Sequence, residues 1–588
     1  MGFDHRSSAL DYRKKNRNKI VKTIIQLLVL FLTAYALFHA LVDVEKYDEP
    51  DKTEWTGDNG FIALSYFGVS RSGTPKLISK NELNKHLKAL KDQGYETISQ
   101  QDVLDYYEKG ARLPEKALFL SFEDGRNDSA LFAQKLLEKY NYKATFLSYA
   151  NKMGNSDRKF VQPDDMKKMT RNGYWELGSN GYRLTYINIF DSEGEFIGMK
   201  DENELRNKMK IDYYNHYLMD FIRDENMIPT EDRGEMEERI EADYRLMEEI
   251  YEDELGYVPG AYMIMHANAL NQGMNRLVSD ANNENIKRIF DMHFNRDGFA
   301  LNDRQDDVYD LTRVQPAPYW YTNHLLMKIR HDTGQDVRFV TGDGERAGKW
   351  NTLSGAAEFI EDRIALTSEP AGAGMLVLQD SESYRDIELS ATLSGNVVGK
   401  QSLYARYDLS KDAYVKVWSD NNELAVEQKK PGQSAELLAK KKLAEFDWNE
   451  TDLALNKATV YSLAETSEQD LTEETRYPVN VANERVIRLN LQGTKLRVAV
   501  DDEETVIDLE IDPSIGSGSV AVASEPNPLN ERDEIYDGVF DGLEVRALNA
   551  EGEVEELLYS NRFTGIRKWI VEARRAFDST VDWMIETF

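Results

Sequence analysis

Glu123 and Asp124 stand side by side at the end of the apolar run ALFLSF, and Gly125 follows them directly. A carboxylate in such a position can bind a metal ion, or it can act as a general base or acid. Asp128 lies four residues beyond Asp124. This stretch therefore supplies two candidate catalytic residues, Glu123 and Asp124, with Asp128 as a candidate substrate-binding residue.

Few other residues could complete a transition-metal site. The chain contains no cysteine and eight histidines, and no two histidines lie three to five residues apart. Thiolate ligands and a closely spaced histidine pair are therefore excluded. Asp124 remains the only candidate metal ligand, and we expect no cofactor. The alternative is a harder cation, such as Mg²⁺, Mn²⁺ or Ca²⁺, held by the oxygens of Glu123, Asp124 and Asp128.

Short apolar runs alternate with amphipathic segments from residue 61 to about residue 340. This alternation predicts parallel strands joined by crossover helices, in an α/β layer or barrel. Sites in such folds lie at the carboxyl ends of strands, which is where Glu123 and Asp124 would stand. Residues 191–250 are long, charged and helical in period, so they predict a helical insertion within this domain.

The pattern changes after a predicted linker at residues 341–370. Segments with period-two alternation, separated by Gly, Asp and Asn, fill residues 371–548 and predict an all-β sandwich. Its aromatic residues could stack on sugar rings, or they could fill the core: Tyr404, Tyr407, Tyr414 and Trp418. Residues 549–588 should end in an amphipathic helix, which would pack on the β-sandwich, on a membrane or on a partner protein.

The amino-terminal segment predicts a membrane anchor. Residues 1–22 hold seven Lys or Arg against two Asp, and residues 23–42 hold no charged side chain. Twenty helical residues span about 30 Å, the thickness of the hydrocarbon core of a bilayer. The run is longer than the roughly 7–15 apolar residues of a secretory signal, which favours an uncleaved transmembrane helix over a signal peptide. The basic tail would then be cytoplasmic, and everything after a linker at residues 43–60 would be extracellular.

Residues 61–330 resemble the NodB-homology polysaccharide deacetylases. In that family one strand ends in Thr-Phe-Asp-Asp-Gly, a later strand reads like KATFF, and a third ends near GHEIGSHTxxH. This chain has SFEDG, YKATFLSYA and NGYWELGSNGYRL in the same order. The resemblance implies a distorted β/α barrel in which Asp124 is the metal-binding aspartate and Glu123 replaces the general base.

The same resemblance implies a degenerate metal site. Where the family has its two metal-binding histidines, this chain has Asn180 and Leu184, with Tyr182 and Arg183 between them. Asn180 could offer only a weak carbonyl oxygen, Leu184 offers no ligand, and Arg183 would repel a cation if it pointed inward. Asn180, Tyr182 and Arg183 are therefore predicted to bind substrate and not a metal ion.

Later parts of the chain extend the resemblance. His266 follows GYVPGAYMIM, at the place of a family substrate loop, and Arg313 lies in LTRVQPAPYW, which resembles the final strand. Both are candidate substrate-binding residues, with a purely structural role as the alternative. The second domain resembles concanavalin-like jelly rolls, because YDGVFDGLEVRAL is similar to their final strand. That likeness implies glycan binding.

These features predict a membrane-anchored protein of exopolysaccharide or cell-wall glycan synthesis that has lost metal-dependent deacetylase activity and binds or assembles a polysaccharide. One alternative is an active carbohydrate esterase with a carboxylate site. Another is a glycan hydrolase or lyase, for which Glu123 and Asp124 are a poor pair because neighbouring strand side chains point to opposite faces. A polysaccharide synthase could bind the insertion or the terminal helix. The formal net charge of −32 argues against a nucleic-acid partner.

Overall fold

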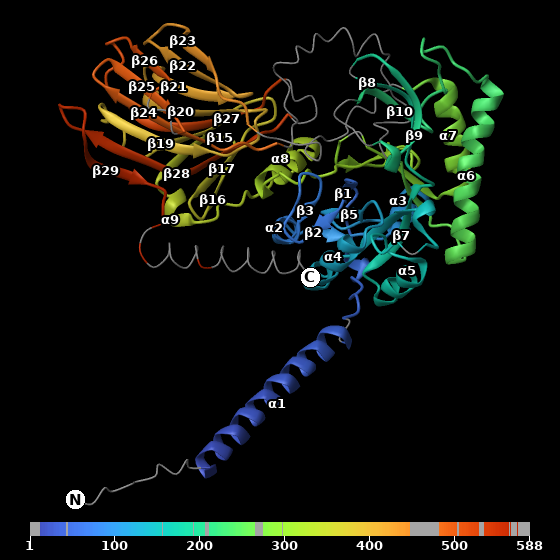
Figure 1. Cartoon of the computed structure of the whole chain (residues 1–588). Coiled ribbons are helices and arrows are strands. Elements are labelled where there is room, and N and C mark those ends of the chain that lie inside the picture. The colour runs from blue at the N-terminus through green and yellow to red at the C-terminus, as the bar shows by residue number, and fades with distance from the viewer. Residues whose placement is uncertain are drawn as a thin grey trace, which may run out of the picture.

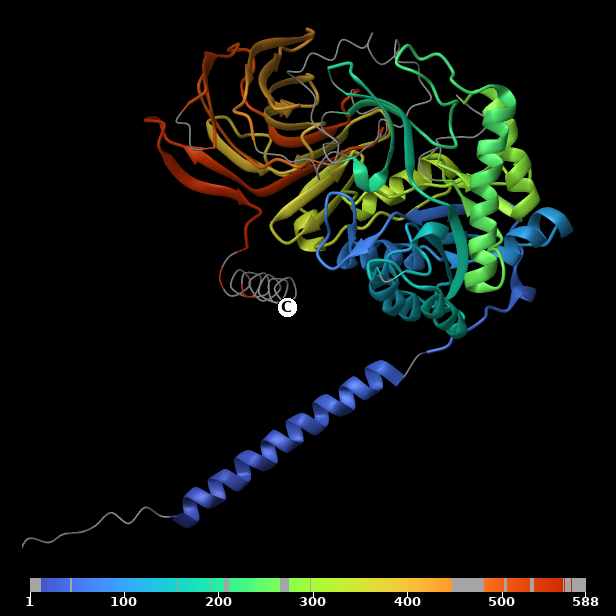
Figure 2. The ribbon, with the colours of Figure 1, turned by 45° about the vertical axis from the view of Figure 1, so that its right-hand side comes forward.

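The computed structural model describes residues 12–42, 45–155, 157–191, 193–205, 211–264, 274–296, 298–446, 481–501, 505–528 and 534–563, together with Gly565 and Ala573. A single helix, α1 (Tyr12–Val42), projects away from the rest of the chain in both views (Figure 1 and Figure 2). In the described part of the chain, no helix is both long enough and apolar enough to cross a membrane. The predicted span at residues 23–42 is thus not confirmed, and the side chains of residues 35–42 lie outside the described part.

The first domain is a distorted β/α barrel, as predicted. Its main sheet has the order β13-β1-β5-β6-β7-β11-β12-β14, with β4 beside β5. All neighbours in this sheet run parallel except β13, which is antiparallel to β1. The strands are β1 (Phe61–Tyr66), β4 (Glu96–Thr97), β5 (Ala117–Phe122), β6 (Ala144–Tyr149), β7 (Trp175–Gly181), β11 (Ala261–Met263), β12 (Met292–Asn295), β13 (Leu301–Asn302) and β14 (Leu311–Thr312).

The last strand of the barrel returns to the first. Leu64 of β1 forms a parallel bridge with Val314, just after β14. Every residue of β1 and of β5 is buried, which explains why both strands read as continuous apolar runs. The covering helices are α2 (Lys80–Asp92), α3 (Gln100–Lys109), α4 (Asn127–Tyr140), α5 (Pro163–Met169), α6 (Arg233–Leu255), α7 (Arg276–Ile289) and α8 (Thr322–Thr333).

The predicted helical insertion at residues 191–250 is wrong over most of its length. The segment contributes to a separate antiparallel sheet of order β10-β8-β9, formed by β8 (Thr185–Asp191), β9 (Phe196–Asp201) and β10 (Ile211–His216). Only α6 is a long helix there. The many charges of the segment suggested one helix throughout, but aromatic and β-branched residues of β8 and β10, together with Leu205 between β9 and β10, form a small core of their own: Tyr186, Ile189, Leu205, Ile211 and Tyr214.

The second domain, called the β-domain here, consists of two antiparallel sheets that enclose one apolar core. One sheet has the order β15-β18-β27-β20-β21-β22-β23, and the other has the order β16-β17-β28-β19-β24-β25-β26, with β29 beside β28. The strands are β15 (Trp350–Ser354), β16 (Ala356–Ile360), β17 (Arg363–Thr367), β18 (Gly374–Leu378), β19 (Ile387–Leu393), β20 (Lys400–Asp408), β21 (Ala413–Asp420), β22 (Glu423–Lys429), β23 (Ala435–Lys442), β24 (Arg485–Gln492), β25 (Lys495–Val500), β26 (Ile507–Glu510), β27 (Ser519–Glu525), β28 (Asp537–Leu548) and β29 (Val554–Ser560).

The β-domain is larger than its predicted range of residues 371–548. The supposed linker at 341–370 contains a short helix, α9 (Gly344–Ala347), and three strands, β15 to β17. These strands are short, and Gly355 separates β15 from β16, so the sequence there lacks a clear alternation. At the other end, β29 occupies the start of the predicted helical range 549–588. Residues beyond Phe563 lie outside the described part of the chain, apart from Gly565 and Ala573.

Asp537, at the start of β28, connects the two domains. Its carboxylate accepts hydrogen bonds from the Thr367 hydroxyl at 2.6 Å and from the Tyr321 backbone N–H at 3.1 Å, and it lies 2.9 Å from Nδ1 of His324 in α8. Arg330 of α8 also pairs with Glu369. These contacts join α8 and the residue before it to the start of β28, so they hold the barrel and the β-domain together.

Candidate functional site

Glu123 follows β5 at the carboxyl end of the barrel and is completely buried. Its Oε1 accepts hydrogen bonds from the Ser65 hydroxyl at 2.6 Å and from Nε of Arg313 at 2.8 Å. Burial by itself would raise the pKa of Glu123, but the charge and hydrogen bond of Arg313, with the Ser65 hydroxyl, bring the pKa below its usual value. Glu123 is therefore an ionised carboxylate held in an ion pair.

Arg313 is as deeply buried as Glu123. Besides its bond to Glu123, it donates from Nη1 to the Phe294 carbonyl at 2.9 Å and from Nη2 to the Ile264 carbonyl at 3.3 Å. The guanidinium thus joins the ends of three barrel strands: β5, β11 and β12. The sequence predicts that Arg313 binds substrate or has a structural role; its contacts are those of an internal ion pair, and substrate binding stays a prediction.

Asp124 turns the chain sharply after β5. Its φ is +66° and that of Gly125 is +63°, so two successive residues adopt the left-handed conformation. A Cβ at Gly125 would lie 3.0 Å from Cβ of Ser148, which explains the glycine. The Asp124 side chain is 13% exposed, and Oδ2 lies 3.7 Å from Nη1 of Arg126.

The electrostatic surroundings of Asp124 differ from those of Glu123. Burial, and next the negative charge of Glu202, raise the pKa of Asp124 to about 7, against a smaller opposing effect of Arg126. A carboxyl group with that pKa is partly protonated at neutral pH, which is the range in which a general acid or base works best. Of the two predicted catalytic carboxylates, only Asp124 has this property.

Asn180, at the position of the first family histidine, uses both polar atoms of its side chain. Its Oδ1 accepts a hydrogen bond from the Asp124 backbone N–H at 3.0 Å, and its Nδ2 donates to the Met263 carbonyl at 3.0 Å. Leu184, at the position of the second, is buried in a small apolar cluster with Tyr149 and Phe67. Both positions therefore hold the fold together and offer no metal ligand.

The other residues of the altered motif face elsewhere. Nε of Arg183 lies 3.4 Å from Oδ1 of Asp243 in α6, and its guanidinium lies over the rings of Tyr182 and Tyr217. The arginine thus pairs with α6 and stays away from Asp124, so it does not repel a cation there. Tyr182 is half-buried as part of this stack.

Asp128 lies apart from Glu123. Its side chain is 54% exposed in the first turn of α4, and Oδ2 lies 3.8 Å from Nη2 of Arg126. Arg126 therefore lies close to both Asp124 and Asp128, while Glu123 is bound to Arg313. The predicted gathering of three carboxylates around a hard cation is wrong, because two guanidinium groups neutralise them. His266 lies outside the described residues, so its predicted role stays a prediction.

Among the described residues, the side chains around Asp124 do not supply the ligands of a divalent metal ion. A zinc site of this kind needs three protein ligands with an open position, and Asp124 would be the only one of them. The described part of the chain contains no group of three or more His, Cys, Asp or Glu side chains placed to hold a metal ion. Asp124 instead lies 3.7 Å from the Arg126 guanidinium, measured from Oδ2 to Nη1.

Sequence reasoning missed three residues of this site. Ser65 comes from β1, 58 residues before the carboxylate that it contacts. Arg296, just after β12, contributes a positive charge that lowers the pKa of Glu123, and burial lowers its own pKa. Tyr149, at the end of β6, has a buried hydroxyl without a hydrogen-bond partner among the described residues. Only the position of each at a strand end could have suggested a role.

The predicted aromatic residues of the β-domain form a cluster on the outer face of one sheet. Tyr404 packs against Tyr407 and Tyr414, with ring centroids 5.8 and 5.1 Å away. These side chains pack with Ala521 and Ala523 and lie outside the main core. Trp418 is covered by Lys400 instead. Tyr404 is buried, and Tyr407 and Tyr414 are half-buried beside it, so only the outer two rings of the tyrosine cluster, Tyr404, Tyr407 and Tyr414, could stack on a sugar ring.

Comparison with known proteins supports the first domain. The family model for polysaccharide deacetylase matches residues 110–258. The protein YxkH of Bacillus subtilis (strain 168), named as a polysaccharide deacetylase, is 29% identical over 110 residues, which are 19% of this chain and 38% of that protein. A poly-beta-1,6-N-acetyl-D-glucosamine N-deacetylase of Staphylococcus aureus (strain MRSA252) is 20% identical over 184 residues, 28% of this chain and 62% of that protein. The chain thus spans less than two thirds of each of these relatives.

Solved structures are similar to each domain separately. A de-N-acetylase from Aggregatibacter actinomycetemcomitans is 20% identical, with 44% of this chain and 96% of that chain covered and a TM-score of 0.34. The carbohydrate-binding module CBM66 from Bacillus subtilis is 14% identical, with 34% and 94% covered and a TM-score of 0.23. Residues 110–258, which form part of the barrel, match the family model for polysaccharide deacetylase.

Proposed function

We propose that this protein binds a polysaccharide of exopolysaccharide or cell-wall glycan synthesis and does not deacetylate it through a metal ion. The observation that carries the proposal is the state of the two former ligand positions: Asn180 has both polar atoms in hydrogen bonds, and Leu184 is buried among apolar side chains. Glu123, at the position of the general base, is ionised and paired with Arg313. A carboxylate in that state binds protons weakly and is a poor base.

The relatives support an amino-sugar polymer as the ligand. The Staphylococcus aureus relative is named for poly-beta-1,6-N-acetyl-D-glucosamine. A deacetylase domain that no longer holds the metal ion can still recognise such a chain, because the surface that binds the polymer extends beyond the reacting acetyl group. The tyrosine cluster of the β-domain offers a second surface for stacking on sugars.

Binding and acetate release can be measured on the same samples. Purified protein is mixed with poly-β-1,6-N-acetylglucosamine, with EDTA in one set of samples and with added Zn²⁺ in another. Bound protein is separated by sedimentation, and free acetate is determined. In both sets we expect saturable binding and no acetate above the level of the buffer control. Acetate release that EDTA removes and Zn²⁺ restores would contradict the proposal.

A second candidate function is a metal-independent carbohydrate esterase. It is favoured by the position of Asp124 at the left-handed turn after β5, where burial raises its pKa to about 7, a value that suits proton transfer at neutral pH. In this case the protein would release acetate in EDTA, and Asp124→Asn would abolish the release while Asp128→Asn would not. Equal rates in the wild type and in Asp124→Asn would eliminate this candidate.

We also propose that residues 23–42 anchor the protein in the cell membrane, with residues 1–22 in the cytoplasm and the two domains outside. Support comes from the sequence alone, namely twenty residues without a charged side chain after a strongly basic tail. Membranes washed with alkaline carbonate should retain the full chain. A variant without residues 1–44 that stays in the washed membranes would contradict this role of the segment.

A further inference from the structure

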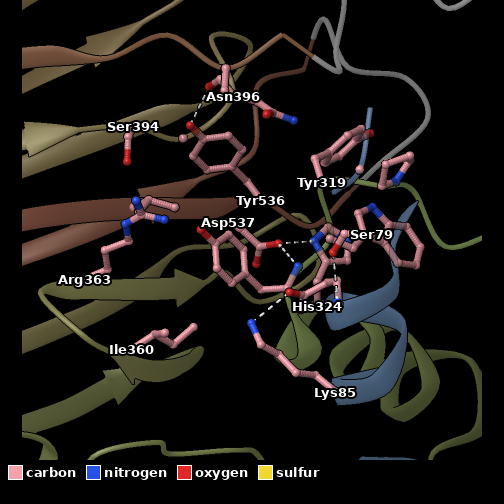
Figure 3. A pocket seen from close by; sticks show the side chains of 18 of the residues that line it. Ser79, Lys85, Tyr319, His324, Ile360, Arg363, Ser394, Asn396, Tyr536 and Asp537 are labelled. Atoms are coloured by element: carbon pink, nitrogen blue, oxygen red, sulfur yellow. Dashed lines mark hydrogen bonds and ion pairs between the residues drawn. The ribbon is translucent and has the colours of Figure 1, made fainter. Parts of the chain in front are cut away.

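The two domains meet at a junction that contains a small apolar cluster. Each domain has a core of its own. The cluster that spans them consists of Met327 of α8, Phe339, Ala356 of β16 and Ile535. Ile535 also lines a cavity of about 470 Å³ between the domains (Figure 3). Two domains with separate cores and a small apolar contact can change their relative position, so the polar groups of the junction matter for how firmly they are held.

Glu358 is buried at this domain junction. It lies on β16, which packs against α8 of the barrel. Side chains alternate between the two faces of a strand, and Phe359 points into the core of the β-domain while Ala356 belongs to the junction cluster. Glu358 therefore faces the barrel. It is 6% exposed, and its Oε2 is buried without a hydrogen-bond partner among the described residues.

The charged and titratable side chains that act on Glu358 come from both domains. Glu82 and Lys85 lie on α2, Tyr321 directly precedes α8, and Asp537 begins β28. Lys85 is the cation of this group, and its Nζ already donates to Oε2 of Glu82 at 2.8 Å. The two neighbouring carboxylates outnumber the one shared ammonium group, so an ionised Glu358 would be repelled at the junction.

The other charged groups of the junction form ion pairs or stay neutral. The pairs are His324 with Asp537, Arg330 with Glu369, His331 with Glu534 and Arg363 with Asp541. Burial lowers the pKa of His86 on α2, which keeps it uncharged near neutral pH. Figure 3 shows His324 beside Asp537. A proton on His324 strengthens that pair, which also favours a firm junction at low pH.

The pH dependence of the junction follows from the proton on Glu358. Burial raises the pKa of Glu358 to about 7, with Lys85 opposing the rise and with Glu82 and Asp537 adding to it. In separated domains the side chain would reach water, where the pKa of glutamic acid is about 4.3. The joined state therefore binds a proton that the separated state releases. Joining is strongest at low pH, and its equilibrium constant falls as the pH rises through 7.

We propose that the domain junction is a pH-sensitive device, which holds the two domains together at mildly acidic pH and loosens when Glu358 loses its proton. The repulsion comes from Glu82 and Asp537, which face the ionised carboxylate. The inference is independent of the proposed function, because it concerns the relative position of the domains and not their ligand. At mildly acidic pH the end of the barrel and the tyrosine cluster would keep a fixed spacing.

Distance measurements on the full-length protein in detergent test the proposal. The chain contains no cysteine, so spin labels attach only to introduced ones. Leu131→Cys on α4 and Leu437→Cys on β23 place one exposed label on each domain. Pulsed electron spin resonance then gives the distances between the labels at pH 6 and pH 8.5. We expect a single narrow set of distances at pH 6, and a ratio of joined to separated chains that falls about tenfold by pH 8.5.

Three variants of the labelled protein separate the role of Glu358 from other effects of pH. Glu358→Gln has no proton to lose, so its ratio should stay within about twofold between the two pH values. Glu556→Gln, which changes an exposed carboxylate on β29 of the same sheet, is the matched control and should respond like the wild type. Met327→Ala weakens the apolar cluster, so it makes separation measurable if the wild type stays joined at both pH values.

Two results would overturn the inference. The first is a ratio that is the same at pH 6 and pH 8.5 in both the wild type and Met327→Ala. The second is an equal fall of the ratio in Glu358→Gln and in the wild type, which would assign the pH dependence to another group. Neither result bears on whether the protein binds a polysaccharide.

Discussion

Replacing Arg313 with methionine should destabilise the first domain by about 3–5 kcal/mol at pH 7, the usual cost of removing one partner of a buried ion pair. The substitution leaves the buried Glu123 carboxylate with the Ser65 hydroxyl as its hydrogen-bond donor and with Arg296 as the nearby positive charge. It also removes the donors to the carbonyls of Phe294 and Ile264. The midpoint of urea-induced unfolding of the first domain, followed by tryptophan fluorescence, measures the loss.

The double variant Glu123→Gln with Arg313→Met is the matched control. Because glutamine has nearly the same shape without the charge, this variant should recover a large part of the stability lost in Arg313→Met. The loss in the single variant should also shrink at low pH, since the unpaired carboxyl group then takes up a proton. A loss below about 1 kcal/mol in Arg313→Met, or no recovery in the double variant, would show that Glu123 is not held as described.

Replacing Asp124 with asparagine should change the pH dependence of stability. The pKa of Asp124 rises from 3.8 to about 7 on folding. The folded state therefore binds a proton that the unfolded state releases, so the wild type loses stability as the pH rises from about 4 through 7. A shift of about 3 pKa units corresponds to at most about 4 kcal/mol. Asparagine has no proton to lose, so Asp124→Asn should be the more stable protein above pH 7.

Urea titrations at pH 4, 6 and 8 measure this effect. At pH 4 the wild type and Asp124→Asn should differ little, and at pH 8 the variant should be more stable by a few kcal/mol. Asp128→Asn is the control, because Asp128 is exposed on α4 next to the same Arg126. If the difference in stability between Asp124→Asn and the wild type is the same at pH 8 as at pH 4, the raised pKa of Asp124 is contradicted.

The barrel could be predicted from the sequence because its strands are buried on both faces. The continuous apolar runs of β1 and β5 differ from β9 and β10, where apolar and charged residues mix, and the helical period of the following α6 dominated the pattern of the segment. The first three strands of the β-domain were missed for a related reason. They are short and joined by tight turns, so their local sequence resembles a linker. Their strand pairing depends on distant partners, since β15 pairs with β18 and β17 pairs with β28.

The motif singled out Glu123, Asp124 and Asn180, and the structure brings Asn180 to Asp124 and Arg313 to Glu123, while their predicted roles toward a substrate stay predictions. The sequence could not show that Arg313 binds Glu123, which lies 190 residues earlier in the chain. It also could not show that both polar atoms of the Asn180 side chain form hydrogen bonds, one with Asp124 and one with Met263. The direction of Arg183 was equally hidden, because Asp243 lies on a helix whose position depends on tertiary packing. Contacts between distant strand ends are not local properties of a sequence.

The central claim of the proposed function is that the first domain does not hold a metal ion, and a zinc titration tests it most directly. The protein is freed of metal with a chelator, dialysed, and titrated with Zn²⁺ by calorimetry at pH 7.5, with Asp124→Asn in parallel. We expect no stoichiometric binding in either protein, and only weak heats that are the same in both. Binding of one Zn²⁺ per chain at micromolar or lower Kd, lost in Asp124→Asn, would contradict the claim.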